Sequence, residues 1–503
     1  MNYNSTTNKK NIVSSAQAIA QGISNDGGLF VPAEIPAYND HEFIELLNLD
    51  YNGRAKKVIA DFLTDFSTEE IADCVDKAYT AEKFGNSNPA PIVSTNINGN
   101  DVNILELWHG PTSAFKDMAL QILPHFLTKS LKKTYKGKEA VILVATSGDT
   151  GKAALEGFKD VAGTKIIVFY PMDGVSPMQK RQMTTQQGNN VDVCAIEGNF
   201  DDAQTGVKKI FTTKEITEKL ESNNKLFSSA NSINWGRLLP QIVYYISAYC
   251  DLVNTNKIEF GSEINIAVPT GNFGNILAAY YAHLMGIPVK KFICASNSNN
   301  VLTDFINTGT YNKTRDFYTT ISPSMDILVS SNLERLLYIL SDNDDTKVKD
   351  YMIKLKKTGK YTVSKKVKDK LKQQFFGGFC DDEATQNTIN NLYKQSNYLA
   401  DTHTAVAINV YNQYVEETED SETPVLLVST ASPYKFSKSV LEAIEPKKSL
   451  PKSEFDIVDK LSEISGVKVP APLAELKNST ARFNSITSID RMSNYVLKVL
   501  EID

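Results

Sequence analysis

The stretch His109-Gly110-Pro111-Thr112-Ser113-Ala114-Phe115-Lys116-Asp117 places one lysine in a run of small and aromatic residues. The segment after it, Met118–Leu131, keeps helical spacing in its apolar residues Ala119, Ile122, Leu123, Phe126, Leu127 and Leu131. Because Gly110 and Pro111 break the chain just before, we expect Lys116 at the start of a helix. A partly desolvated lysine there is a candidate amine nucleophile, since burial lowers its pKa. The alternative, which this stretch alone favours, is a lysine whose stem covers apolar surface while its ammonium reaches water.

From about residue 100 onward, short apolar runs alternate with helical patterns. Ala140–Ala145 is a continuous apolar run, typical of a strand buried on both faces. Further strands are predicted at Lys165–Tyr170, Val191–Ile196, Glu263–Val268, Lys291–Ala295 and Pro424–Ser429, and helices at Lys152–Lys159, Leu238–Leu252 and Ile276–Met285. This alternation predicts an α/β protein with parallel sheets. Residues 340–395 are lysine-dense and predict a peripheral helical insertion, interrupted at Phe375-Phe376-Gly377-Gly378.

Three loops rich in small polar residues follow predicted strands: Thr146–Gly151, Gly271–Asn275 and Thr430–Pro433. In open parallel sheets, ligands bind at the carboxyl ends of the strands, so we expect these loops to form one site. Gly271-Asn272-Phe273-Gly274-Asn275 lets the backbone approach an anion at a helix N-terminus, and it matches neither a dinucleotide fingerprint nor a P-loop. Alone, this loop is equally consistent with a glycine turn and a helix cap. Combined with Lys116, it suits a phosphorylated aldehyde cofactor, pyridoxal phosphate.

Six ordered motifs resemble those of the threonine synthase family, and the resemblance covers nearly the whole chain. They are Asp26–Pro32, His109–Asp117, Ser147–Gly151, Asn231–Arg237, Gly271–Gly274, and Ser322–Asp326 with Ser331–Arg335. The resemblance implies the tryptophan-synthase-β-like fold (fold type II), with two parallel-sheet α/β domains. It implies an N-terminal domain at 1–98, a smaller α/β region at 99–205 carrying Lys116, and a larger region at 206–503. The length is similar to that of the bacterial and fungal branch.

The resemblance also implies roles for individual residues. Lys116 would form the Schiff base with pyridoxal phosphate and carry protons, and Thr430 would face the pyridine nitrogen. The cofactor phosphate would be bound by Gly271, Asn272, Phe273, Gly274 and Asn275, and the substrate by Thr146, Ser147, Asp149, Thr150, Asn231 and Arg237. The last position of the phosphate loop is often Asp in the family and is Asn275 here. Ser432 stands where many relatives have histidine, so any role of that histidine is absent.

The implied reaction converts O-phospho-L-homoserine and water to L-threonine and phosphate, the last step of threonine biosynthesis. The nearest alternative is another lyase of the same fold, such as a serine or threonine dehydratase. Those relatives are shorter and lack the Asn231–Arg237 motif. A different class is a regulatory relative without chemistry, which an intact Lys116, phosphate loop and Thr430 disfavour.

Composition and net charge limit the classes of binding partner and the location that we expect. A net charge of −6 over 503 residues argues against nucleic-acid or membrane binding. The five cysteines are widely spaced, which favours reduced thiols, and the histidines show no metal-ligand spacing. The polar start, Met1–Lys10, has no apolar signal core, so we expect a cytoplasmic protein. Family resemblance favours a monomer over a dimer.

Overall fold

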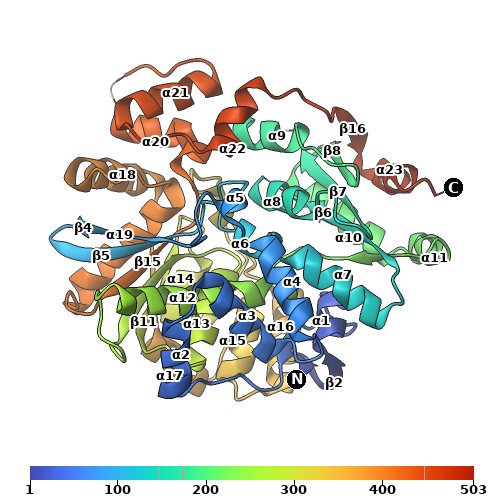
Figure 1. Ribbon diagram of the computed structural model, residues 1–503, viewed down its shortest axis with the longest axis horizontal. Helices are drawn as coiled ribbons and strands as arrows, with labels where there is room; N and C mark the ends of the chain where they lie inside the picture. Colours follow the sequence, from blue (N-terminus) through green and yellow to red (C-terminus); the bar gives the residue numbers. More distant parts are fainter. Residues whose placement is uncertain (147, 173–174, 447, 503) are drawn as a thin grey trace.

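The computed structural model describes residues 1–146, 148–172, 175–446 and 448–502. Two parallel sheets with helices around them make up most of the protein (Figure 1). The larger sheet has the strand order β14-β11-β10-β15-β5-β4, and the smaller has the order β16-β8-β7-β6-β9. A third, antiparallel sheet of order β2-β1-β3 forms near the N-terminus. The expectation of an α/β fold with parallel sheets is confirmed.

The larger sheet is parallel except at one edge, where β4 runs antiparallel to β5. Its strands are β4 (Ile92–Ile97), β5 (Asn100–Glu106), β10 (Ile264–Pro269), β11 (Val289–Ser296), β14 (Phe375–Phe379) and β15 (Val425–Ser429). The strands β10 and β15 are buried along their whole length, as continuous apolar runs predict. β14 corrects a prediction, because Phe375–Phe379 pairs with β11 and is the edge strand of the main sheet, not an interruption in a peripheral insertion.

The smaller sheet is parallel throughout. Its strands are β6 (Glu139–Ala145), β7 (Thr164–Pro171), β8 (Val191–Glu197), β9 (Lys225–Ser228) and β16 (Ser485–Ser488). The predicted strands in this region therefore form within a residue or two of their expected ends. The division at residues 98 and 205 stays a prediction about domains, and strands of both sheets come from either side of residue 205.

The predicted helix after Lys116 is broken in two, as α6 (Asp117–Leu120) and α7 (Leu123–Thr134). The cause is Pro124, which lacks an N–H and whose ring would clash with the Leu120 carbonyl in a continuous helix. That carbonyl turns instead toward Gly157 of α8 (Asp149–Phe158), where no Cβ would fit. The glycine therefore lets α6 and α8 pack closely.

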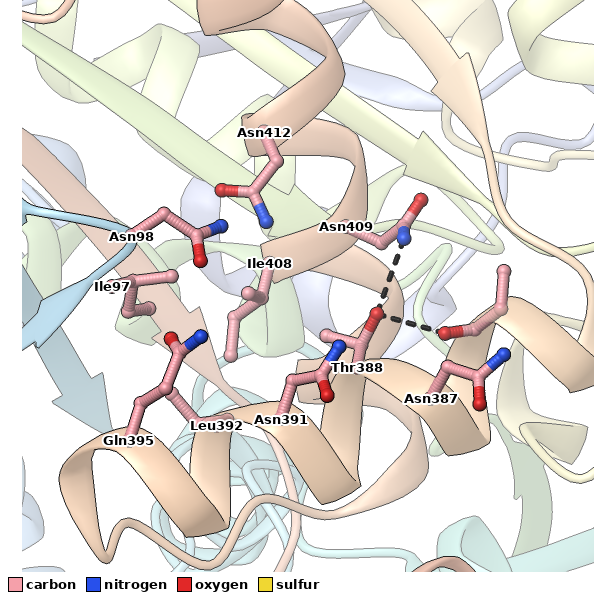
Figure 2. A pocket seen from close by; sticks show the side chains of 11 residues that line it. Ile97, Asn98, Asn387, Thr388, Asn391, Leu392, Gln395, Ile408, Asn409 and Asn412 are labelled. Carbon is pink, nitrogen blue, oxygen red and sulfur yellow. Dashed lines mark hydrogen bonds between the residues drawn. The ribbon is translucent and has the colours of Figure 1, made fainter.

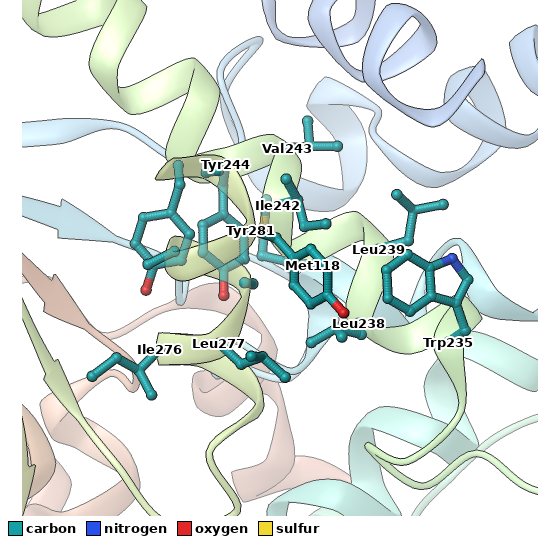
Figure 3. Close-up of a cluster of buried hydrophobic side chains, with 14 of the residues drawn as sticks. Met118, Trp235, Leu238, Leu239, Ile242, Val243, Tyr244, Ile276, Leu277 and Tyr281 are labelled. Carbon is teal, nitrogen blue, oxygen red and sulfur yellow. The ribbon is translucent and has the colours of Figure 1, made fainter. Parts of the chain in front are cut away.

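Two helices support the centre of the molecule. α12 (Trp235–Asn254) packs along α13 (Gly274–Leu284), and Trp235 lies edge-on to Tyr281 with ring centroids 5.4 Å apart. Figure 3 shows Met118 of α6 against the same cluster of α12 and α13 side chains. The core thus joins the helix after Lys116 to the helix that follows the predicted phosphate loop.

The remaining helices cover the sheets and the N-terminal region. The strands near the N-terminus are β1 (Asn2–Ser5), β2 (Asn8–Ser14) and β3 (Phe30–Pro32). Among the helices that follow them, α4 begins with a Ser67 cap and a reciprocal Glu70 contact. The other helices include α1 (Ser15–Gln21), α2 (Asp40–Leu47), α3 (Tyr51–Phe62), α4 (Thr68–Ala78), α5 (Ala81–Phe84), α9 (Pro177–Thr184), α10 (Phe200–Thr212), α11 (Lys214–Ser222), α14 (Val301–Thr308), α15 (Leu333–Leu340), α16 (Asp345–Thr358), α17 (Lys365–Gln374), α18 (Asp382–Ser396), α19 (Thr402–Thr418), α20 (Ser437–Ile444), α21 (Glu454–Ser465), α22 (Ala471–Ala474) and α23 (Met492–Val499).

Candidate active site

Lys116 occupies the N-cap position of α6, as predicted, and 11% of its side chain is exposed. The turn before it is held by Asp117, whose carboxylate accepts hydrogen bonds from Thr112 N and Thr112 Oγ1, both at 2.8 Å. Gly110 is required there, since a Cβ would lie 2.5 Å from Asp117 Oδ2. The loop therefore presents Lys116 from a tightly hydrogen-bonded turn.

The Lys116 loop is attached to the strand-end loop after β15. Phe115 N donates to Thr430 O at 2.8 Å, and Ala114 forms an isolated antiparallel bridge with Ala431. Thr430 itself is 6% exposed. These contacts bring two of the predicted segments together, at the carboxyl end of the larger sheet.

The strand-end loop after β6 contributes Asp149, the first residue of α8. Its Oδ2 lies 3.7 Å from Lys116 Nζ, and its Oδ1 lies 2.9 Å from Lys435 Nζ. Gln179 Nε2 also donates to Oδ1 at 2.9 Å. Burial alone would raise the pKa of Asp149, but the charges of Lys435 and Lys116 hold it well below the usual range. Asp149 is therefore a carboxylate placed between two lysines.

Arg237 adds a third cation to the two lysines, and it is 5% exposed. Its Nη1 donates to Ala230 O at 2.9 Å, and within the described part of the chain no carboxylate lies within 4.0 Å of its guanidinium. Burial lowers its pKa to about 10, so it stays charged at neutral pH. A buried charge without a counter-ion is costly, and such a group is characteristic of an anion-binding site.

The surroundings of Lys116 lower its pKa from 10.5 to about 8. Burial is the largest cause, because it disfavours the ammonium form, and the positive charges of Arg237 and Lys435 act in the same direction. Asp149 opposes them. About a tenth of Lys116 is thus a neutral, nucleophilic amine at pH 7, and this fraction rises with pH.

This pKa predicts the pH dependence of aldehyde capture by Lys116. The neutral amine fraction rises with pH, so the attachment rate of pyridoxal phosphate should increase about tenfold between pH 7 and 9 and then level off. An unshifted lysine would keep gaining up to about pH 10.5. Stopped-flow absorbance at about 410–430 nm measures the rate, with a free lysine peptide as the reference for the aldehyde's own titration. A rate that still climbs above pH 9.5 would contradict the lowered pKa.

The predicted phosphate loop ends at the N-terminus of α13. Phe273, the N-cap, has φ of 61°, so the left-handed residue is not one of the two glycines. Gly271 is needed for another reason, since a Cβ there would lie 2.7 Å from Ser324 O. The first N–H groups of α13 have no partner within the helix and are available to an anion.

Asn275 tests whether this loop fits a phosphate. Its Oδ1 accepts hydrogen bonds from Tyr244 OH at 2.5 Å and Tyr245 OH at 2.7 Å. Two hydroxyl donors fix the orientation of the amide, and Asn275 Nδ2 is buried without a partner among the described residues. An unsatisfied donor at a helix N-terminus matches an anionic group, so the residues present fit the phosphate of pyridoxal phosphate.

For the remaining predicted site residues within the described ranges, the structure gives exposure or local hydrogen bonds, and no hydrogen bond to Lys116. Thr146 is buried, and its hydroxyl accepts from Gly148 N and Gly151 N at 3.0 Å, so it closes its own loop. Asn231 is exposed. Asn272 is exposed and Thr150 is half-buried, while Ser147 lies outside the described residues. The binding roles of these residues stay predictions.

Two residues near Lys116 were missed by the sequence analysis. Ser324 Oγ is 3.3 Å from Lys116 Nζ, and the only signal for it was the Ser322–Asp326 motif, which received no role. Lys435 is 1% exposed, and its Nζ donates to Thr112 O at 2.9 Å as well as contacting Asp149. The only sequence signal for Lys435 was its position two residues after the Thr430–Pro433 loop.

Lys116 does not line either of two other pockets. One has a volume of about 250 Å³. Figure 2 shows its lining of neutral side chains from α18, α19 and the β4–β5 turn, including Asn98, Asn391 and Asn412. It offers no ionisable group for catalysis. A larger one of about 1140 Å³ contains lysines paired with carboxylates, such as Lys129 with Asp73 and Lys152 with Glu156.

Some features are absent from the described ranges. No helix there is long and apolar enough to cross a membrane. The same residues contain no group of three or more histidine, cysteine, aspartate or glutamate side chains that could hold a metal ion. All five cysteines are buried and unpaired.

A lysine at the carboxyl ends of parallel strands, beside a helix N-terminus suited to phosphate, defines a pyridoxal-phosphate-dependent enzyme of fold type II. Three family comparisons agree with this class. The pyridoxal-phosphate dependent enzyme family matches residues 88–353, the threonine synthase N terminus matches residues 2–79, and the threonine synthase C-terminal family matches residues 404–491. The chain belongs to the threonine synthase family.

Individual relatives show the same likeness. The chain is 33% identical to the threonine synthase of Saccharomyces cerevisiae, over 93% of both proteins. It is 41% identical to threonine synthase-like 1 of Homo sapiens over 86% of this chain, and it spans only 58% of that relative's length. The crystal structure of PLP-bound threonine synthase from Brucella melitensis has a TM-score of 0.86 and 33% identity, covering 99% of each chain.

Proposed function

We propose that this protein converts O-phospho-L-homoserine and water to L-threonine and phosphate. The observation that carries the proposal is Arg237, a buried guanidinium without a carboxylate partner in the described structure, whose charge reaches Lys116. The α13 N-terminus serves one phosphate, that of the cofactor. A substrate with its own phosphate needs a second cationic site, and Arg237 supplies it, because Lys435 is already paired with Asp149.

The overall change breaks the Cγ–O bond to phosphate and forms a new bond between Cβ and a water oxygen. One hydrogen leaves Cβ, one is added at Cγ, and Cα is deprotonated and later reprotonated. Pyridoxal phosphate, when bound, supplies the electron sink that makes these carbon acids accessible. Lys116 is the group suited to move the Cα and Cβ protons, because its pKa of about 8 allows both protonation states near neutral pH.

Charge is also arranged for the leaving group. Negative charge accumulates on the phosphate oxygens as the Cγ–O bond breaks, and Arg237 is a buried cation whose charge reaches Lys116. In a site that excludes water such cations stabilise charge more strongly than they would in solution. Thr430 would meet the pyridine nitrogen with a neutral hydroxyl, which enforces its protonation less than a carboxylate would.

A product assay tests the reaction. With O-phospho-L-homoserine as substrate we expect L-threonine and phosphate in equal amounts, measured by amino-acid chromatography and a phosphate assay. L-Homoserine is the matched control, and it should not react because it lacks the group that Arg237 recognises. A 2-oxoacid with ammonia as the product would identify a dehydratase-like lyase and overturn the proposal. No turnover by the cofactor-loaded protein would favour a non-catalytic relative.

The proposal includes a cytoplasmic monomer. Buried, unpaired cysteines support a reducing location. Light scattering at several protein concentrations would overturn the monomer if the mass were a stable multiple of one chain.

A further inference from the structure

The N-terminus of α19 lies near Lys116, and Asp401 is the N-cap residue of this helix. Asp401 is fully buried. Its Oδ2 accepts hydrogen bonds from His403 N at 2.9 Å and from His403 Nδ1 at 2.8 Å, while its Oδ1 accepts from Thr404 N at 3.2 Å and from the Thr404 hydroxyl. This is more than a helix cap requires, because the carboxylate also holds an imidazole in one orientation.

The carboxylate determines which nitrogen of His403 carries the proton. An ionised carboxylate is an acceptor only, so Nδ1 must be the donor to Asp401. In the neutral ring Nε2 then keeps a lone pair, and it accepts a hydrogen bond from Ser324 N at 3.1 Å. A backbone N–H is always a donor, so this contact agrees with the same tautomer.

Ser324 connects this imidazole with Lys116. It lies in a short 3-10 turn, Pro323–Met325, and its Oγ is the hydrogen-bond partner of Lys116 Nζ at 3.3 Å. Its carbonyl faces Gly271, where a Cβ would come within 2.7 Å. His403 thus binds the N–H of Ser324, the Ser324 carbonyl lies close to the phosphate loop, and the Ser324 hydroxyl faces Lys116.

The same helix end also reaches the loop that carries Thr430. The Thr404 hydroxyl lies 3.0 Å from Ser429 Oγ, which accepts from Trp108 Nε1 at 3.0 Å. Ser429 is the last residue of β15, directly before Thr430. Asp401 therefore contacts two side chains, and each leads to a residue of the candidate site.

We propose that Asp401 and His403 are positioning residues that set the place of Lys116 through Ser324. The inference deepens the proposed function and rests on it for its kinetic test. Neither residue touches Lys116 directly. Their effect is on the amine, which must approach the cofactor aldehyde and the substrate carbons at a defined angle, and small displacements of such a group are costly.

Two substitutions at His403 separate this role from simple packing. His403→Leu fills similar space but offers no acceptor to Ser324 N–H, whereas the amide oxygen of His403→Gln restores one. For His403→Leu we expect kcat with O-phospho-L-homoserine to fall about 10- to 100-fold with KM changed less than about threefold, and His403→Gln to recover most of the loss. His283→Leu is the control, since that imidazole bonds the Ile287 carbonyl at 2.8 Å and lies in the last turn of α13, at the end opposite the phosphate loop.

A double-mutant cycle with Ser324→Ala tests the route. If His403 acts through the serine hydroxyl, His403→Leu should change kcat less than about twofold in the Ser324→Ala background. The capture rate of pyridoxal phosphate by the cofactor-depleted full chain, followed at about 410–430 nm, should show the same pattern. This second readout needs no turnover, so it tests the inference even if the protein does not make threonine.

Three results would overturn the inference. They are a His403→Leu variant with kcat and capture rate near those of the wild type, additive losses in the double mutant, and equal losses in His403→Leu and His403→Gln. A His403→Leu loss matched by His283→Leu would mean that the effect is one of general stability.

Discussion

Replacing Lys116 with alanine should abolish the absorbance band at about 410–430 nm that pyridoxal phosphate gives when joined to a lysine. Turnover of O-phospho-L-homoserine should fall on the order of 10³- to 10⁴-fold, because the same amine both holds the cofactor and moves protons. The visible spectrum and steady-state kinetics measure the two effects.

Lys129→Ala is the matched control for that experiment. Lys129 is also largely buried and ion-paired, with Nζ 2.7 Å from Asp73 Oδ2, but it lies on α7, away from the strand-end loops. It should retain the band and the activity. If borohydride reduction still attaches the cofactor to the Lys116→Ala protein, another lysine forms the covalent bond and the assignment is wrong.

Arg237→Ala should lower kcat/KM for O-phospho-L-homoserine by about 2–4 kcal/mol, roughly 30- to 1000-fold, with the cofactor band intact. The loss is large because the guanidinium is buried and acts on the charge that develops as phosphate leaves. Arg237→Lys should recover only part of it, since an ammonium cannot reproduce the bidentate fork. A near-normal kcat/KM in Arg237→Ala, or cofactor loss from that variant, would contradict the assignment.

Stability distinguishes Arg237 from a structural arginine. Arg54 is equally buried but contacts the Asp251 carboxylate at 2.5 Å. Removing Arg54 leaves Asp251 without its cationic partner, whereas removing Arg237 leaves no buried carboxylate unpaired among the described residues. We therefore expect the melting temperature of Arg54→Ala to fall more than that of Arg237→Ala, while only Arg237→Ala loses kcat/KM.

Much of the secondary structure could be predicted because its causes are local. The apolar run Ala140–Ala145 became β6, and the alternation around it became the parallel sheets. Pro124 indicates a break in the helix after Lys116, but the apolar periodicity of Met118–Leu131 led to the prediction of one continuous helix. Phe375–Phe379 could not be recognised as β14 by pattern, since its two glycines and lysine-rich flanks resemble a loop until the strand pairs with β11.

In the candidate site, too, some residues could be predicted from local sequence signals and others could not. Lys116 and the loop Gly271–Asn275 are recognisable because a helix start and a glycine-containing loop are signalled by neighbouring residues. Nothing near Arg237 in the chain says that it lacks a counter-ion. Only the burial of its guanidinium shows that.

The sequence by itself therefore determined the class of fold, the lysine at the helix start and the strand-end loops, because periodicity, glycine and proline act over a few residues. Only the tertiary structure decided which groups surround that lysine. Ser324 is 208 residues from Lys116, and Lys435 is 323 residues from the Thr112 carbonyl that it binds. The lowered pKa of Lys116 depends on burial and on Arg237 and Lys435, and these are properties of packing that no local pattern carries.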